Sequence, residues 1–130
     1  MITFLGFNKT QQLVILPLAI SFWMSGVFLV RLLSSYGLWG GWSGAVIFAL
    51  SIPAAAISIR GVQMLLRLTP SEVLPTVALI TALVAMLHGV AITYVASLYR
   101  AQGPELILAS AWLVWFVGAV LISLLLMKRQ

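Results

Sequence analysis

The chain has 130 residues, of which 63% are hydrophobic and 7% charged, and its formal net charge is +5. Soluble domains carry about 25% charged residues and bury about two thirds of their unfolded surface at this size, so the composition excludes a water-soluble fold and predicts an integral membrane protein. The sequence has no cysteine, which excludes disulfides, thiolate metal sites and cysteine nucleophiles. We expect the positive charge to orient the chain and to meet anionic lipid head groups, not to bind nucleic acid.

Four apolar stretches are long enough for helices that cross a bilayer, which takes about 20 residues each. They cover residues 12–33, 41–59, 75–98 and 105–127, and the links between them are short. The sequence therefore predicts a single membrane domain, residues 1–130, folded as an all-α four-transmembrane-helix bundle.

Basic residues are divided unevenly between the two ends of this bundle. Five lie on the side that holds the two termini and the second link, and two on the other: Lys9, Arg60, Arg67, Lys128 and Arg129 against Arg31 and Arg100. Because cytoplasmic segments carry an excess of lysine and arginine, we predict that the N- and C-termini are cytoplasmic and that the protein lies in the cell (inner or plasma) membrane.

The first link, "SSYGLWGGW" at residues 34–42, is typical of an interfacial loop. Its Tyr36, Trp39 and Trp42 are predicted to form an aromatic anchor, and Tyr99 is expected to anchor the same interface after the third span. Pro53 is predicted to kink the second span, since it frees the carbonyl of a residue one turn earlier.

Both acidic residues have the positions of helix caps. Thr69 and Glu72, in "TPSE", have the spacing of a capping box, and Glu105 in "GPE" opens the fourth helix near the positive end of its dipole. Because Pro75 cannot donate a backbone hydrogen bond, the segment from Pro70 is expected to be a short interfacial turn that bends into the third span.

Small residues form a stripe along the third span, with a further glycine in the fourth, and we predict that they allow close helix packing. These residues are Ala78, Ala82, Ala85, Gly89, Ala96 and Gly118. Lipid gives helices no hydrophobic reason to associate, so close approach depends on such residues. The stripe favours a compact bundle and a homodimer or a larger membrane protein complex.

Trp23, Ser51, His88 and Trp115 lie near the centres of the four spans, one in each, and are candidate ligand-binding residues. His88 is the only histidine. One interpretation is that these side chains only hold helices together, as polar groups in spans often do. The other is a functional site, since an intramembrane imidazole can transfer a proton or ligate a haem iron or a chlorophyll magnesium. The sequence leaves both interpretations open and does not identify a cofactor.

Several short segments together resemble a family of small uncharacterised bacterial four-span membrane proteins, known only as a domain of unknown function. The segments are "FLVRLL" (28–33), "FALSIP" (48–53), "RLTPSE" (67–72) and "AWLVWFVGAVL" (111–121). In that family an acidic residue often occupies the position of His88, so this chain departs from the pattern there. The resemblance implies the four-span topology and no established activity.

The sequence lacks the groups on which an enzyme would depend: a carboxylate pair, a serine–histidine–acid set, a metal-ligand cluster and a phosphate-binding loop. We therefore expect no catalytic residues and no metal site. The favoured hypothesis is an accessory or scaffold subunit of a larger membrane assembly that holds a lipid, quinone or pigment. The alternative is a small dimeric transporter or channel, although the first span lacks the embedded glutamate by which the small multidrug transporters couple transport to protons.

Overall fold

The computed structural model describes residues 7–128, which form four long helices. They are α1 (Lys9–Ser35), α2 (Gly41–Leu66), α3 (Pro70–Tyr94) and α4 (Pro104–Lys128), with a short 3₁₀ turn, η2 (Ala96–Tyr99), between the last two. Each of the four helices is long and apolar enough to cross a membrane. The predicted all-α bundle of four transmembrane helices is confirmed.

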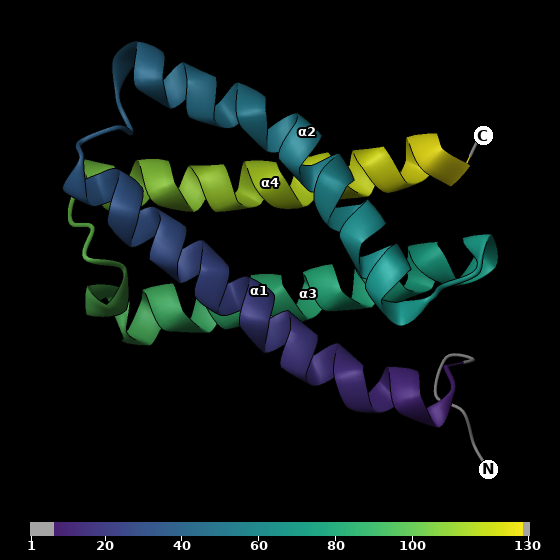
Figure 1. Ribbon diagram of the computed structural model, residues 1–130. Helices are drawn as coiled ribbons and strands as arrows, with labels where there is room; N and C mark the ends of the chain where they lie inside the picture. Colours follow the sequence, from purple (N-terminus) through teal and green to yellow (C-terminus); the bar gives the residue numbers. More distant parts are fainter. Residues whose placement is uncertain (1–6, 129–130) are drawn as a thin grey trace.

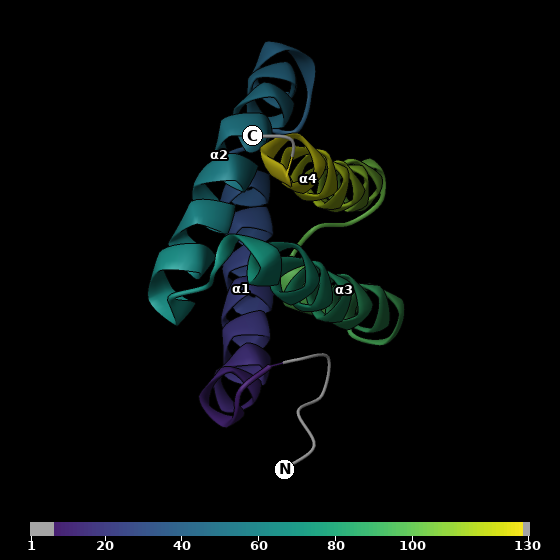
Figure 2. The ribbon, with the colours of Figure 1, turned by 90° about the vertical axis from the view of Figure 1, so that its right-hand side faces the viewer.

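The helices lie in two crossed layers (Figures 1 and 2). Helices α1 and α2 form one layer and run obliquely over α3 and α4, which form the other. Helix α1 packs mainly on α3, and α4 packs on both α2 and α3, whereas α1 and α2 share few contacts. This arrangement leaves the α1–α2 side of the bundle the least tightly closed.

Helix starts follow local rules of hydrogen bonding. The side chain of Asn8 accepts a hydrogen bond from the backbone N–H of Gln11 at 2.8 Å, and Gln11 Oε1 accepts from the N–H of Asn8 at 3.0 Å. At the start of α3, Glu72 Oε2 accepts from the N–H of Thr69 at 2.8 Å. These reciprocal contacts satisfy donors that a helix start leaves free. Glu105 lies in the first turn of α4.

The third span differs from the sequence-based prediction at both ends. Helix α3 begins at Pro70 and continues through Pro75 without an interfacial turn, and it ends at Tyr94, four residues before the expected boundary. The backbone donor that Pro75 lacks would have bonded the carbonyl of Ser71, which lies in the exposed first turn of the helix. Because a carbonyl at that position can be solvated from the helix end, the proline does not break the helix.

The first and the last helix have their outer ends, at Lys9 and Lys128, on the same side of the bundle. The start of α1, the α2–α3 link and the end of α4 lie together, and the other two links lie opposite (Figure 1). Lys9, Arg67 and Lys128 therefore share one end, as the sequence predicted, while Arg129 lies outside the described residues. The cytoplasmic location of this end stays a prediction.

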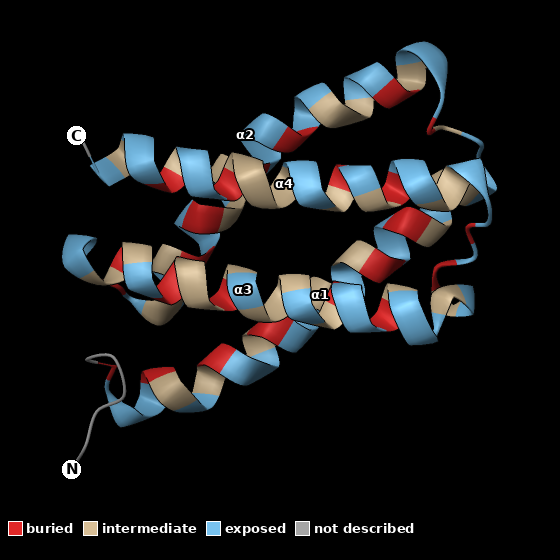
Figure 3. Cartoon of the chain, turned by 180° about the vertical axis from the view of Figure 1, so that it is seen from behind, coloured by how far each residue is buried: buried red, intermediate tan, exposed pale blue. Residues whose placement is uncertain are grey.

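Many large apolar side chains are exposed on the outside of the bundle. Buried residues form short bands along each helix, separated by exposed stretches (Figure 3). Ile57, Val114 and Ile107, for example, are each more than 70% exposed. Such an exterior suits lipid as the surrounding solvent, because exposed apolar patches of this extent are rare on soluble monomers. The structure thus agrees with the composition in defining a multi-pass membrane protein.

Candidate functional site

The buried imidazole of His88, in α3, forms a hydrogen bond with the side chain of Tyr99, which lies in η2 just after α3 ends. His88 Nδ1 and the hydroxyl of Tyr99 are 2.8 Å apart, and the two residues are 6% and 0% exposed. After α3 ends at Tyr94, the turn η2 reverses the chain and brings Tyr99 back under the helix, with Arg100 in the left-handed region at φ 51°. Tyr99 is therefore a buried hydrogen-bond partner and not the interfacial anchor that the sequence suggested.

Helix α1 approaches the same imidazole through Gly26. A Cβ atom placed on Gly26 would lie 2.7 Å from His88 Nε2 and 2.9 Å from Cε1, distances that real side chains do not reach. Tyr99 holds the opposite side of the ring, so the imidazole has little freedom to move away. Only glycine at this position allows α1 to pack against the ring at Nε2 and Cε1.

The hydrogen-bond partners define which ring nitrogen of His88 carries the proton. The Tyr99 hydroxyl has one proton and, among residues 7–128, its one hydrogen-bond partner is His88 Nδ1. If Nδ1 donated to the tyrosine oxygen, the hydroxyl proton would be buried without an acceptor, at a cost of about 1–3 kcal/mol. We therefore assign Nδ1 as the acceptor, which places the proton of the neutral ring on Nε2. No hydrogen bond to Nε2 occurs within the described part of the chain.

Trp23 approaches the Tyr99 hydroxyl from α1. Its indole nitrogen is buried and makes no hydrogen bond to a described residue. Burial raises the pKa of Tyr99 above its ordinary value of 10.0, and the nearby indole N–H of Trp23 partly opposes this effect. The tyrosine thus stays neutral and keeps its proton for His88. The positions of Trp23 and His88 along their helices differ. Trp23 lies near the centre of α1, one residue past its midpoint, whereas His88 lies six residues, about 9 Å, from the end of α3.

A cavity of about 280 Å³ lies beside His88, between the two layers of helices. All four helices line it, mostly with apolar side chains. Its hydroxyl groups are already bonded within their own helices: Ser25 donates to Ser21, Ser58 to Ala54 and Thr81 to Val77, over 2.7–2.8 Å. His88 Nε2 therefore differs from the other polar groups of the wall, because it is a donor without a partner among the described residues.

A second buried polar contact connects α2 and α4. Trp112 Nε1 donates to the hydroxyl of Ser51 at 2.6 Å, and this hydroxyl in turn donates to the carbonyl of Ile47 at 2.8 Å. The Trp112 ring packs against Trp39, with ring centroids 5.6 Å apart. Trp39 is 3% exposed, so it belongs to the core and not to the interface, unlike Trp42, which is 87% exposed.

The four predicted ligand-binding residues do not form one cluster. Trp23 and His88 both lie next to Tyr99, whereas Ser51 of α2 bonds Trp112 of α4. Trp115 is 46% exposed and donates to the backbone carbonyl of Phe48 at 2.9 Å. Neither Ser51 nor Trp115 lines the cavity. The predicted positions share an approximate depth, but helix rotation turns their side chains in different directions.

The stripe of small residues on α3 does not face the other helices of the chain. The buried side of α3 carries larger residues, including Val77, Ile80 and His88, while Ala82 and Gly89 are exposed. A Cβ on Gly89 would meet no described atom within 4 Å, and the same is true of Gly118 in α4. Ala78 and Ala85 are half-buried, and so is Ala96, which lies in η2 beyond the end of α3. Their role in close packing stays a prediction, and for Ala82 and Gly89 it concerns a surface outside this chain's own bundle.

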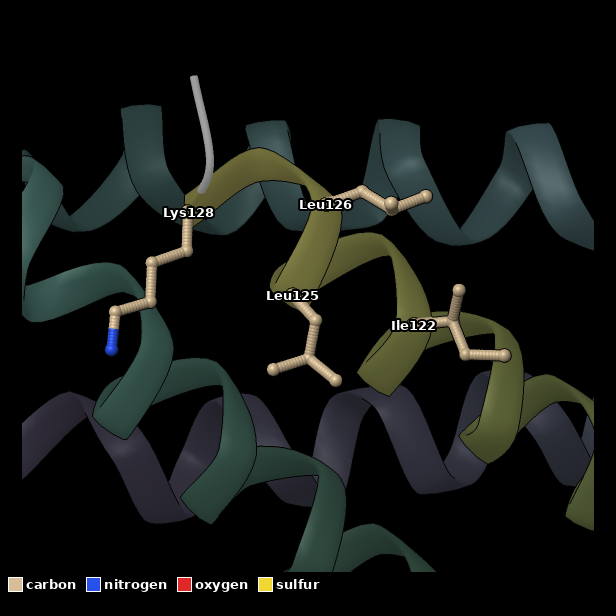
Figure 4. A pocket seen from close by; sticks show the side chains of 4 residues that line it. All are labelled: Ile122, Leu125, Leu126 and Lys128. Carbon is tan, nitrogen blue, oxygen red and sulfur yellow. The ribbon is translucent and has the colours of Figure 1, made fainter.

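A larger hollow, of about 510 Å³, lies at the end of α4. It is lined by Ile122, Leu125, Leu126 and Lys128, and Figure 4 shows that these side chains leave one helix in different directions. The ammonium of Lys128 is the one polar side-chain group among them. A single helix cannot enclose a ligand, so we do not regard this hollow as a site.

Three residues important to the site were not identified from the sequence. An interior helical glycine such as Gly26 is itself a signal of close approach, and that signal was available. Trp112 lies three residues before Trp115, which was the candidate predicted from the sequence, and only the rotation of the helix decides which of the two indoles faces the core. For Tyr99 the sequence carries no signal, because its burial depends on the turn η2.

Comparison of the chain with models of protein families, with curated proteins and with solved structures finds no match. The class of protein is therefore defined by the fold and the site together. It is a four-span membrane protein with a cavity between its helices and, in the cavity wall, a histidine with one of its two ring nitrogens hydrogen-bonded.

Proposed function

We propose that this protein is a non-enzymatic membrane protein that holds a small apolar molecule between its helices, as an accessory subunit of a larger membrane assembly. The observation that carries the proposal is the cavity of about 280 Å³ lined by all four helices. Ligand pockets in proteins are typically apolar concavities of about 300–1,000 Å³ with a few polar groups that fix orientation. This cavity is at the lower end of that range and has the expected apolar wall.

The polar groups of the cavity support binding more than catalysis. Each hydroxyl in its wall donates to a backbone carbonyl of its own helix, and the indole of Trp112 donates to Ser51. A nucleophile needs an adjacent base and a group that orients that base. Within residues 7–128, His88 contacts a tyrosine and a glycine at its two nitrogens, which does not provide such an arrangement.

The outward face of α3 supports the accessory role. Ala82 and Gly89 are exposed, with open space around Gly89. Small residues on a lipid-facing helix allow the backbone of another transmembrane helix to approach closely. A partner subunit or a second copy of the chain would bury this face.

Transport of a small molecule is the second candidate, and the few contacts between α1 and α2 favour it. Ser25 and Leu29 of α1 and Ala54 of α2 line the cavity and are also exposed, so the cavity can be reached from this side of the bundle. A transporter would need such a lateral or alternating opening, while a ligand-holding subunit needs it only for loading.

Purification in a mild detergent, followed by analysis of co-purified proteins and extracted small molecules, tests the proposal. We expect larger membrane partners and a bound apolar molecule, and loss of that molecule in Ala54→Leu, which extends a side chain into the cavity from α2. Ala82→Leu is the matched control, since it adds the same side chain on the outward face of α3 and should release the partner but not the molecule. A monodisperse protein without partners that supports flux in liposomes would contradict the accessory role and favour transport.

A further inference from the structure

We infer that the molecule held in the cavity is uncharged and carries a carbonyl oxygen that accepts a hydrogen bond from Nε2–H of His88. This inference rests on the proposed ligand-holding function and specifies the chemistry of the ligand. Its basis is the one donor in the cavity wall that has no partner within the described residues.

The polar contacts around His88 determine this chemistry. Nδ1 accepts from Tyr99 at 2.8 Å, so the ring proton is on Nε2, at the edge of the ring that lies beside Gly26. His88 itself is 94% buried, and its ring lines the cavity. Nε2 has no partner but is not enclosed, since the fully buried side-chain nitrogen and oxygen atoms without a partner among the described residues are Trp23 Nε1 and Thr76 Oγ1. Lipid provides no water for this donor, and a ligand oxygen placed next to Nε2 would satisfy it.

The rest of the wall limits the charge and the size of the ligand. Among the described residues that line the cavity, none other than His88 is acidic or basic, so a charged ligand would be buried without a counter-charge from them. A cavity of about 150 Å³ is enough to hold benzene. At about 280 Å³, this cavity would hold a molecule of roughly twice that size, such as a bicyclic ring or one ring with a short chain.

The shared chemistry has two possible sources, a free small molecule or the ester carbonyl of a membrane lipid whose chain enters between α1 and α2. The two sources differ in one testable way. In nanodiscs made from diether phosphatidylcholine, a lipid without carbonyl groups, a lipid ester would no longer be available to His88, whereas a free ketone would still bind.

The test uses the single histidine of the chain, which gives one imidazole signal set when the full-length protein is labelled with ¹⁵N-histidine. The probes are 1-tetralone and tetralin, two bicyclic molecules that differ by one carbonyl group. We expect the apo protein to show protonated Nε2 and unprotonated Nδ1. 1-Tetralone should shift the Nε2–H resonance in a saturable manner and bind about two- to tenfold more tightly than tetralin, the range that one neutral hydrogen bond provides.

Two variants separate the inference from the function on which it rests. In His88→Phe the preference for 1-tetralone should disappear while tetralin still binds, and in Ala54→Leu neither probe should bind. Equal binding of both probes to the wild type would overturn the role of Nε2 and leave the ligand-holding function intact. If neither probe binds in ester or ether nanodiscs, the ligand-holding function fails as well.

The protonation of the two imidazole nitrogens in the wild type tests the inference even if His88→Phe does not fold. A proton on Nδ1 in the wild type would overturn it directly. So would an Nε2–H resonance that reports a hydrogen bond to bound water and stays unchanged on addition of 1-tetralone. A resonance that differs between ester and ether nanodiscs without any probe would support the inference and identify the lipid carbonyl as the acceptor.

Discussion

Two buried side-chain hydrogen bonds occur among the described residues, one between α2 and α4 and one between α3 and η2, and they differ in how many of their polar groups have a partner. On the α2–α4 side, the hydroxyl of Ser51 donates to Ile47 and accepts from Trp112, whose one donor is thereby satisfied. On the α1–α3 side, His88 bonds Tyr99 through one ring nitrogen and leaves the other without a partner among the described residues. The first contact is closed, and the second is open toward a cavity.

This difference distinguishes a structural contact from a candidate binding site. A fully satisfied pair inside a membrane gains nothing from a ligand, and hydrogen bonds of this kind are worth about 0.6 kcal/mol on average. An unsatisfied donor in an otherwise apolar wall gives a ligand both orientation and energy. We therefore place function on the His88 side, although one residue of each contact, Ser51 and His88, was a midspan candidate from the sequence.

The largest losses in the free energy of unfolding are expected from substitution of the two glycines that lie beside these contacts, Gly44 and Gly26. A Cβ on Gly44 would collide with the backbone carbonyl of Trp39, and one on Gly26 would collide with the imidazole of His88. Overpacking of this kind costs about 1–3 kcal/mol and occasionally more. We expect Gly44→Ala to lower the free energy of unfolding more than Gly26→Ala does, because backbone atoms move away less easily than a side chain. Gly89→Ala, in open space, is the control, and its free energy of unfolding should lie within about 0.5 kcal/mol of the wild type.

Reversible unfolding in mixed micelles, followed by circular dichroism, measures these free energies. The three substitutions add the same methyl group, so intrinsic helix propensity contributes similarly to each. A Gly26→Ala variant as stable as Gly89→Ala would mean that α1 and α3 do not approach as closely as the structure has them, and the open contact would lose its basis.

Ser51→Ala, which removes the hydrogen bond between Ser51 and Trp112, should lower the free energy of unfolding by a smaller amount. The substitution removes the only acceptor that Trp112 Nε1 has within residues 7–128, and the indole N–H is then buried without a partner. We expect a loss of about 1–2 kcal/mol in the free energy of unfolding.

Ser25→Ala is the matched control for that prediction. The Ser25 hydroxyl is exposed and donates to a carbonyl of its own helix, so its removal leaves no other group unsatisfied, and the change should stay within about 0.5 kcal/mol. If Ser51→Ala were equally neutral, the closed contact would not stabilise the bundle, and the comparison between the two sides would fail.

The sequence predicted the fold far better than the site, for physical reasons. Hydropathy alone determines that a segment must cross the bilayer, so all four spans were found. The error at Pro75 arose because a proline near a solvated helix start is tolerated, whereas the same residue deeper in the helix would not be. The site depends on helix rotation and on one turn: Trp112 and Trp115 differ by 300° around α4, and Tyr99 reaches His88 only because η2 reverses the chain. Neither feature is encoded in composition or hydropathy.

The smallest expected effect concerns the hydroxyl of Tyr99. Tyr99→Phe removes the bond to His88 and should cost about 0.6–1.7 kcal/mol at neutral pH, the average and the upper measured values for such bonds in a membrane protein. The loss is limited because the imidazole borders the cavity and can rearrange. Tyr94→Phe, at a residue 79% exposed, is the control and should be neutral.

This last effect should depend on pH in a defined direction. Burial raises the pKa of Tyr99 in the folded protein above 10.0, so above pH 10 the unfolded chain loses the tyrosine proton before the folded chain does. The unfolded state then binds fewer protons than the folded state, and the stability contributed by Tyr99 falls as the pH rises. The advantage of the wild type over Tyr99→Phe should therefore be constant at neutral pH and shrink above pH 10. An advantage that grows in that range would mean that the tyrosinate is favoured beside His88, which would reverse the assignment of Nδ1 as the acceptor and with it the placement of a free proton on Nε2.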